Sequence, residues 1–276
     1  MSGLTDAANT PNGPPANNTT GSLETVPNAV AVDDDIFPPN TPLAASTTSF
    51  LLGSVVSLGL WLVLNNSHLI TVILQPALWR DVAFNLPGVQ LPFFFAAWAF
   101  FHWAEFAVTA GWNRDKCSTS SFLLDNGREY HIAHSVAVLE FVLTVYFFPN
   151  AKRWNYVTPI GMLVVLGGQF LRSIAMIHAS KNFSHMVAYK RLHGHELVTD
   201  GIYSWSRHPS YVGFFYWGLG TQIALQNPIS FIGYFIVMLR FFQKRIFYEE
   251  KALIRFFGTA YQEYKAKVPT RIPLIR

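Results

Sequence analysis

Residues 209–247 read PSYVGFFYWGLGTQIALQNPISFIGYFIVMLRFFQKRIF. This stretch holds two apolar runs, 209–225 and 229–247, and the turn QNP at 226–228 joins them. A helix that crosses a hydrocarbon core of roughly 30 Å needs about 20 mostly apolar residues, and each run is close to that length. The stretch therefore predicts a tight hairpin of two membrane-spanning helices.

Four more apolar runs precede the hairpin, at approximately 43–64, 91–110, 130–148 and 158–180. A weaker candidate at 68–86 contains a proline, an arginine and an aspartate, and could be an interfacial or re-entrant piece. Of the 276 residues, 51% are hydrophobic and 13% are charged, against about 25% charged residues in an ordinary soluble domain. We therefore expect an all-α, multi-spanning transmembrane helix bundle of about six spans, with seven or eight left open.

The N-terminal residues 1–42 differ from the rest of the chain. They are rich in Asn, Thr, Pro, Ala and Gly, contain no Lys or Arg, and include an acidic run at 33–35. Such a composition cannot bury a core, so we expect a disordered tail. No basic segment followed by an apolar core opens the sequence, so a cleaved signal peptide is not indicated. The remaining residues, 43–276, should form one membrane domain with short loops.

The distribution of basic residues predicts the orientation, because cytosolic loops are enriched in Lys and Arg. With six spans and both termini in the cytosol, all but four of the 20 Lys and Arg lie on the cytosolic side. The exceptions are Arg80, Lys152 and Arg153 on the opposite side, and Arg172 inside a span. The two largest polar segments, before the hairpin and after it, then share the cytosolic side, where we expect the chemistry.

Several classes of function are not indicated. The net charge of +4 does not suggest a nucleic-acid partner, because the basic residues form no blocks and do not alternate with stacking aromatics. Cys117 is the only cysteine, which excludes an intramolecular disulfide. The histidine pairs at 131 and 134, and at 193 and 195, have no Cys or carboxylate that completes a recognisable ligand set, so we expect no metal.

Five ionisable residues lie inside predicted spans, where a charge is costly and usually faces protein or a water-filled cavity. They are His102, Glu105, Glu140, Arg172 and His178. One interpretation is a polar site between helices, with Arg172 paired to Glu105 or Glu140. The alternative, equally consistent with the sequence, is a structural role in which these ionisable side chains pair with one another and fix the packing of the helices.

The segment HELVTDGIYSWSRHPSY at 195–211 leads into the hairpin. His208 stands before Pro209, which favours extended geometry at His208 and suits the first position of a helix at Pro209. A helix start with free N–H groups at the membrane surface attracts a carboxylate or a phosphate. The segment therefore predicts a candidate anion site.

The segment RFFQKRIFYEEKALIRFFG at 240–258 follows the last predicted span. Arg245 and Glu249 are four residues apart and so share one helix face. By itself, the segment also fits an amphipathic helix that lies on the bilayer.

Taken together, these pieces resemble the isoprenylcysteine carboxyl methyltransferase family, from about residue 91 to the end of the chain. The stretches that carry the resemblance are FHWAEFAVTA at 101–110, SSFLLDNGREY at 120–130, HELVTDGIYSWSRHPSYVGFFYWGLGTQ at 195–222, NPIS at 227–230 and RIFYEEKALIRFFGTAYQEYKAKVP at 245–269. The resemblance implies an endoplasmic reticulum membrane enzyme with six or eight spans and a catalytic part at about 158–276. Its cytosolic active site would be formed by the loop before the C-terminal hairpin and the tail after it.

The resemblance also implies the cofactor, S-adenosylmethionine, and its site. The implied cofactor contacts are His195, Glu196, Leu197, Val198, Tyr203, His208, Pro209, Ser210, Tyr211 and Glu249. Arg245 would meet the substrate carboxylate, and Arg172 is carried over as a second catalytic residue. Ala188 departs from the polar cofactor contact of some relatives.

The implied reaction is methyl esterification of the α-carboxylate of a C-terminal S-farnesyl or S-geranylgeranyl cysteine, so the partners would be CaaX-processed prenylated proteins. The sequence leaves the preferred prenyl group open. The alternatives are an NADPH-dependent membrane sterol or steroid reductase, which also places Arg-His-Pro before a span, a phospholipid N-methyltransferase, and a non-catalytic scaffold or receptor.

Glycines cluster in two of the predicted spans, at 161–168 and at 213–220. Small residues let helices approach closely, within one chain or between copies. An oligomer is therefore left open.

Overall fold

The structure is a computed structural model that describes residues 38–66, 86–186 and 194–276. Within these residues every regular element is a helix, as predicted. The long helices are α1 Pro42–Asn66, α3 Leu86–Trp112, α4 Arg128–Phe147, α5 Val157–Ala179, α7 Pro209–Leu225 and α8 Pro228–Phe257. The short ones are η2 Arg114–Lys116, η3 Thr119–Phe122, η4 Ser180–Asn182, α6 Ile202–Trp205 and α9 Thr259–Lys267. The predicted tail up to residue 37 and the weak span candidate up to residue 85 lie outside the described residues.

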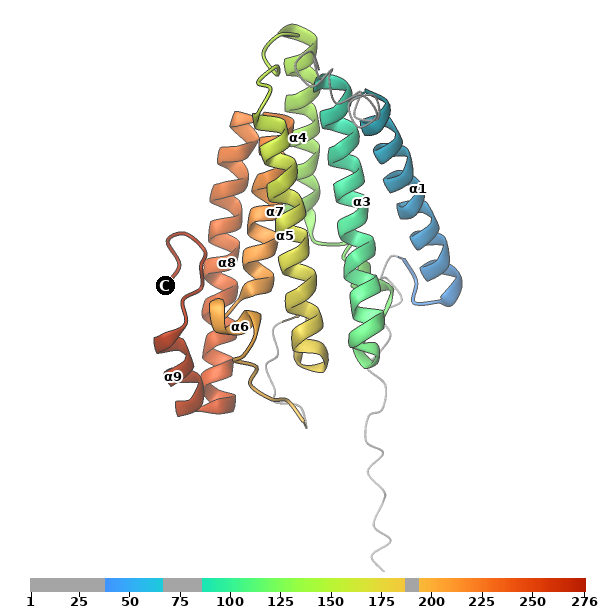
Figure 1. Cartoon of the computed structure of the whole chain (residues 1–276). Helices are drawn as coiled ribbons and strands as arrows, with labels where there is room; N and C mark the ends of the chain where they lie inside the picture. The colour runs from blue at the N-terminus through green and yellow to red at the C-terminus, as the bar shows by residue number, and fades with distance from the viewer. Residues whose placement is uncertain (1–37, 67–85, 187–193) are drawn as a thin grey trace, which may run out of the picture. The chain divides into compact units, whose positions relative to one another are not determined.

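The six long helices run side by side in one bundle (Figure 1). Four helical stretches in the described part of the chain are long and apolar enough to cross a membrane: Pro42–Asn66, Gly88–Trp112, Arg128–Phe147 and Val157–Asn182. The predicted hairpin forms the last two long helices, α7 and α8. Length and composition alone do not mark these two as spans, because α7 has 17 residues and α8 is charged from Arg240 onward. Their place in the bundle, beside the other four, is what groups them with the spans.

Helix α8 is longer than the predicted span, which ended at residue 247. It continues without a break to Phe257, a length of about 45 Å at the rise of an α-helix. The segment that by itself suggested a separate surface helix is therefore the second half of α8. Gly258, with φ at +57°, ends the helix and lets the chain turn into α9. As a result, Arg245 and Glu249 stand on a rigid extension of the hairpin.

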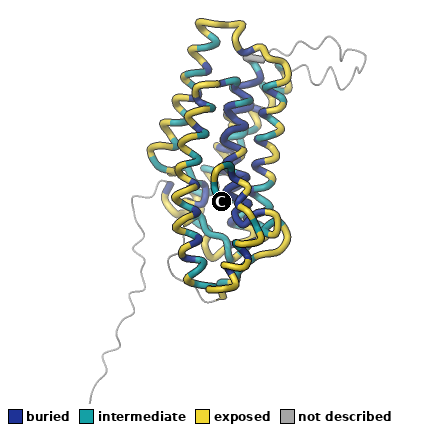
Figure 2. The backbone as a smooth tube through the Cα atoms, turned by 90° about the vertical axis from the view of Figure 1, so that its left-hand side faces the viewer, coloured by how far each residue is buried: buried dark blue, intermediate teal, exposed yellow. Residues whose placement is uncertain are grey.

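Helix α7 is the centre of the bundle, and all but three of its 17 residues are buried. In Figure 2, dark blue gathers in the middle of the bundle, while the outer helices carry mostly teal and yellow. Helices α5 and α7 approach closely because glycines face the partner backbone. A Cβ atom added to Gly168 of α5 would lie 2.6 Å from the backbone nitrogen of Trp217, and one added to Gly213 of α7 would lie 2.6 Å from that of Arg172. These glycines therefore serve packing within the chain.

The Glu140 carboxylate finds its hydrogen-bond donors in the first turn of α8. Its two carboxylate oxygens accept the backbone N–H groups of Ile229, at 3.0 Å, and Ser230, at 2.7 Å. A helix start has N–H groups without helical partners and favours a negative charge. This intramembrane carboxylate is therefore a cap that ties α4 to the hairpin, and Glu140 does not pair with Arg172.

Lys152 holds the other side of the same turn. Its ammonium donates to the backbone oxygens of Leu225 and Gln226 and to Asn227 Oδ1, at 3.1, 2.8 and 2.6 Å. The side chain is buried, although Lys152 lies between two predicted spans, on the side opposite the cytosol. A cation suits the end of α7, where backbone oxygens have no helical partners.

We expect the Glu140→Ala variant to lose about 2 kcal/mol of stability, because two backbone N–H groups lose a charged acceptor. The loss should appear in unfolding titrations of the protein in detergent micelles. Glu129→Ala is the matched control, because Glu129 lies on the same helix and is exposed. Equal stability of the two variants would contradict the capping role.

Candidate active site

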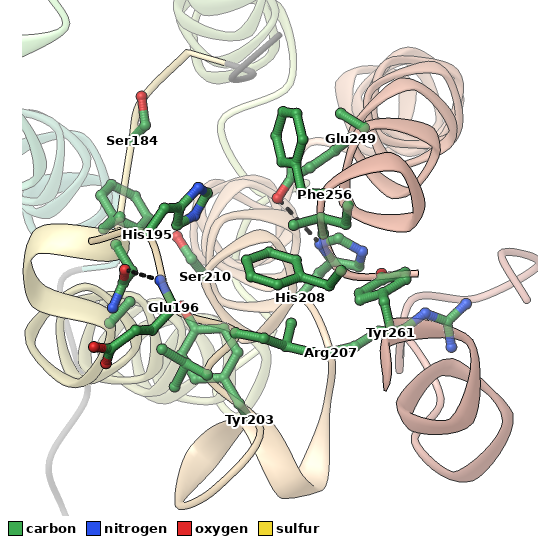
Figure 3. A pocket seen from close by; sticks show the side chains of 18 of the residues that line it. Ser184, His195, Glu196, Tyr203, Arg207, His208, Ser210, Glu249, Phe256 and Tyr261 are labelled. Carbon is green, nitrogen blue, oxygen red and sulfur yellow. Dashed lines mark hydrogen bonds and ion pairs between the residues drawn. The ribbon is translucent and has the colours of Figure 1, made fainter. Parts of the chain in front are cut away.

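A pocket opens at the end of the bundle that carries α6 and α9, and the predicted cofactor residues gather around it (Figure 3). All ten line the pocket: His195, Glu196, Leu197, Val198, Tyr203, His208, Pro209, Ser210, Tyr211 and Glu249. In Figure 3, His195 and Glu196 lie on one side, and Glu249 and Phe256 lie on the other. The structure thus brings together the loop before the hairpin and the second half of α8.

Local contacts shape the segment before α7, which carries the stretch 195–198 and Tyr203. Gly201 adopts φ +51° and packs directly under the His178 ring, where a Cβ atom would have no room. Tyr203 is fixed at both ends, since its hydroxyl donates to the backbone oxygen of Ala175 at 3.2 Å and its own backbone oxygen accepts from Tyr264 at 2.6 Å. The tyrosine therefore stands at a set place in the pocket wall.

Asn182 is a pocket residue that the sequence reasoning missed. Its Oδ1 accepts the backbone N–H of Glu196 at 3.0 Å, which fixes the start of the stretch 195–198. Asn182 lies in η4, at the end of α5, and no motif pointed to it. Ala188 and His193 lie outside the described residues.

Beneath the pocket, Glu250 gathers three basic side chains. Arg207 Nε lies 2.5 Å from Glu250 Oε1, His208 Nε2 lies 3.2 Å from the same oxygen, and Lys265 Nζ lies 2.6 Å from Oε2. Burial alone would raise the pKa of Glu250, but the hydrogen bonds from His208, Lys265 and Arg207 lower it to about 2. Arg207 also donates to the backbone oxygen of Val268 at 2.6 Å. The cluster therefore ties the start of α7 to α8 and to the C-terminal segment.

Tyr211 links the pocket to Arg245. Its hydroxyl donates to Glu249 and accepts from Arg245 Nε at 2.7 Å. The His208 ring stacks on the Tyr211 ring, with centroids 5.4 Å apart and planes 2° apart. Arg245 does not line the pocket, but it donates a hydrogen bond to Tyr211, which does.

Arg172 also lies beside the pocket, and the structure shows which carboxylate it meets. Its Nε and Nη2 donate to the two oxygens of Glu105, and Nη1 donates to Ser210 Oγ at 3.0 Å. The guanidinium packs against the rings of Phe101 and Phe214, 5.4 and 5.2 Å from their centroids. Arg172 therefore reaches the pocket through Ser210, and its charge is balanced inside the bundle.

The pocket can hold a ligand that has both flat and charged parts. The rings of Phe256 and Tyr261 offer faces for a flat ring system, and Glu196 and Glu249 can accept hydroxyl or ammonium groups. The first turn of α7 suits a carboxylate. No group of three His, Cys, Asp or Glu in residues 38–66, 86–186 and 194–276 is placed to hold a metal ion.

Comparisons with known proteins agree with this arrangement. The sequence model of the isoprenylcysteine carboxyl methyltransferase family matches residues 160–255. The protein-S-isoprenylcysteine O-methyltransferase of Saccharomyces cerevisiae is 46% identical over 188 residues, which cover 66% of this chain and 79% of the relative. The enzyme of the same name from Homo sapiens is 46% identical over 176 residues, which cover 64% of this chain and 62% of the relative, less than two thirds of its length.

The fold also matches a solved structure of the eukaryotic intramembrane Ras methyltransferase, an isoprenylcysteine carboxyl methyltransferase. The TM-score is 0.71 and the identity is 33%, over 84% of this chain and 82% of the other. Sequence and structure therefore agree over most of the described helices, and the chain belongs to the isoprenylcysteine carboxyl methyltransferase family.

Proposed function

We propose that the protein uses S-adenosylmethionine to methylate the α-carboxylate of a C-terminal S-farnesyl or S-geranylgeranyl cysteine. The observation that carries the proposal is that one pocket gathers all ten residues expected to contact the cofactor, with Arg245 one hydrogen bond away. Aromatic walls, two carboxylates and a helix start fit the adenine, the ribose and amino groups, and the methionine carboxylate, respectively. When bound, the cofactor supplies an electrophilic methyl group on a sulfonium.

The chemistry needs little acid or base assistance. A C-terminal carboxyl group has a pKa of about 3.5, so at neutral pH it is already an anionic nucleophile. The site has to orient one carboxylate oxygen toward the methyl group and to exclude competing water. We assign the orientation to Arg245, whose guanidinium stays protonated and can hold the second oxygen.

We place Arg172 in a supporting role. Two of its nitrogens are engaged by Glu105 and the third by Ser210, so its donors are directed toward protein groups. Ser210 is the second residue of α7, at the helix start that we assign to the methionine carboxylate. Arg172 would contribute to cofactor binding indirectly, because its bond to Ser210 fixes the start of α7.

The proposed substrate also explains the membrane fold. A prenyl chain is almost pure hydrocarbon, so it can reach the site from the bilayer while the protein part of the substrate stays in water. We propose that the bundle lies in the endoplasmic reticulum membrane with the pocket end and the C-terminus in the cytosol. Prenylated CaaX-processed proteins with a free C-terminal prenylcysteine would be the partners. A sterol reductase or a phospholipid methyltransferase finds no comparable support in these residues.

The test is transfer of labelled methyl from S-adenosylmethionine to N-acetyl-S-farnesylcysteine in membranes that contain the protein. We expect a base-labile methyl ester. The Glu249→Gln variant should bind S-adenosylhomocysteine about 10- to 100-fold more weakly, as expected for loss of a charged hydrogen-bond acceptor. Glu263→Gln removes an exposed carboxylate of α9 and is the matched control. Folded wild-type protein that forms no ester would overturn the proposal.

A further inference from the structure

The Arg245 guanidinium is held by two hydrogen bonds on one edge. Nε donates to the hydroxyl of Tyr211 at 2.7 Å, and Nη2 donates to the backbone oxygen of His185. The same guanidinium packs over the Tyr211 ring, 5.3 Å from its centroid. A guanidinium has five N–H donors in one plane, so two fixed bonds also set the direction of the remaining donors. The carbonyl of His185 is therefore one of two groups that aim Arg245.

The His185 ring is anchored inside the bundle, on helix α3. Nε2 lies 3.2 Å from Thr109 Oγ1, and Nδ1 lies 3.5 Å from Glu105 Oε2. The hydroxyl of Thr109 donates to the backbone oxygen of Glu105 at 2.8 Å, so its oxygen is left to accept. Because the Thr109 hydroxyl donates to Glu105, its bond with the His185 ring requires a proton on Nε2, so the ring is the donor in that bond.

The anchor itself is rigid. Glu105 is buried and makes the two-point ion pair with Arg172. The chain before His185 is held separately, because Asn113 and Lys116 both donate to the backbone oxygen of Phe183, each at 2.9 Å. The ring contacts of His185 are therefore a second attachment of this segment, at the residue that supplies the carbonyl.

We propose that His185 is a positioning residue for the substrate carboxylate. Its ring binds Thr109 beside the Glu105–Arg172 pair, and its backbone oxygen orients Arg245 toward the carboxylate. This inference rests on the proposed function, and it adds a residue that would act through Arg245 without touching the substrate. Removal of the His185 ring should leave Arg245 in place, but the remaining N–H donors of its guanidinium should no longer point toward the substrate carboxylate.

The test separates recognition of the carboxylate from binding of the prenyl chain. The probes are N-acetyl-S-farnesylcysteine and its carboxamide, which has the same prenyl group and no charge. Binding of each to the purified protein is measured with S-adenosylhomocysteine present. We expect the wild-type protein to bind the carboxylate more tightly than the amide. The His185→Ala and Thr109→Val variants should each reduce this preference roughly tenfold, with little change in their affinity for the amide. His185→Gln keeps a side-chain N–H donor and should restore part of the preference.

Two control variants match these changes. Thr144→Val removes a hydroxyl that also bonds to the carbonyl four residues earlier in its helix, at 2.6 Å from the oxygen of Glu140. His131→Ala removes an exposed histidine of α4. Both should keep the wild-type preference. An unchanged preference in His185→Ala and Thr109→Val, or equal weakening for both probes, would overturn the positioning role. Absence of methyl transfer by the wild-type protein would instead reject the proposed function.

Discussion

The Arg245→Ala variant is expected to lose at least about 100-fold in kcat/KM for N-acetyl-S-farnesylcysteine. The estimate corresponds to one charge-assisted contact to a partly desolvated carboxylate, about 2.7 kcal/mol or more. Binding of S-adenosylhomocysteine should change little, because Arg245 does not line the pocket. Arg245→Lys keeps the charge but cannot hold Tyr211, His185 and a carboxylate with one planar group, so we expect only partial activity.

The control for this variant is Lys244→Ala. Lys244 is exposed and adjacent in the sequence, so its removal takes away the same charge from the same part of α8. Initial rates at varied concentrations of the prenylcysteine, with saturating cofactor, provide the comparison. If Arg245→Ala and Lys244→Ala were equally active, Arg245 would have no role in holding the carboxylate.

The arrangement of helices was largely predictable, because membrane-spanning runs are long and their composition is distinctive. The end of α8, the last of the long helices, was not. The predicted span stopped at residue 247, within a stretch that is charged from Arg240 onward, yet the next glycine or proline after that point is Gly258. A change from apolar to amphipathic marks where a helix leaves an apolar environment, and it does not break the helix. Arg245 and Glu249 owe their rigid placement to this continuation.

The groups that fix loops to helices were harder to predict. Lys152 stands in a polar loop and nothing near it in the sequence indicates that it caps α7, 73 residues later. His185 and Asn182 are similar cases, because their partners lie 76 and 14 residues away. Such contacts depend on where helix ends meet in space, which periodicity does not determine. The pocket residues were predicted through resemblance to a family, and the contacts around them became visible only in the fold.

The Gly168→Ala variant is expected to lose roughly 2–3 kcal/mol of stability, as for overpacking of a close helix contact. The added methyl group would lie 2.6 Å from the backbone nitrogen of Trp217 and 2.7 Å from the backbone oxygen of Gly213. Backbone atoms cannot turn aside as a side chain can, so α5 and α7 would have to separate. Separation would also strain the bond from Arg172 on α5 to Ser210 on α7. We therefore expect weaker binding of S-adenosylhomocysteine together with a lower unfolding midpoint in detergent.

Gly167 is the adjacent residue of the same helix and supplies the control. A Cβ atom at Gly167 meets nothing within 4 Å. Both variants gain the same intrinsic helix propensity, up to about 1 kcal/mol for glycine to alanine, so any difference between them reports the contact with α7. Gly167→Ala should match the wild type or exceed it in stability. If both alanines were equally well tolerated, close glycine packing would not be what holds α7 against α5, and another interaction would have to fix the start of α7 beside the pocket.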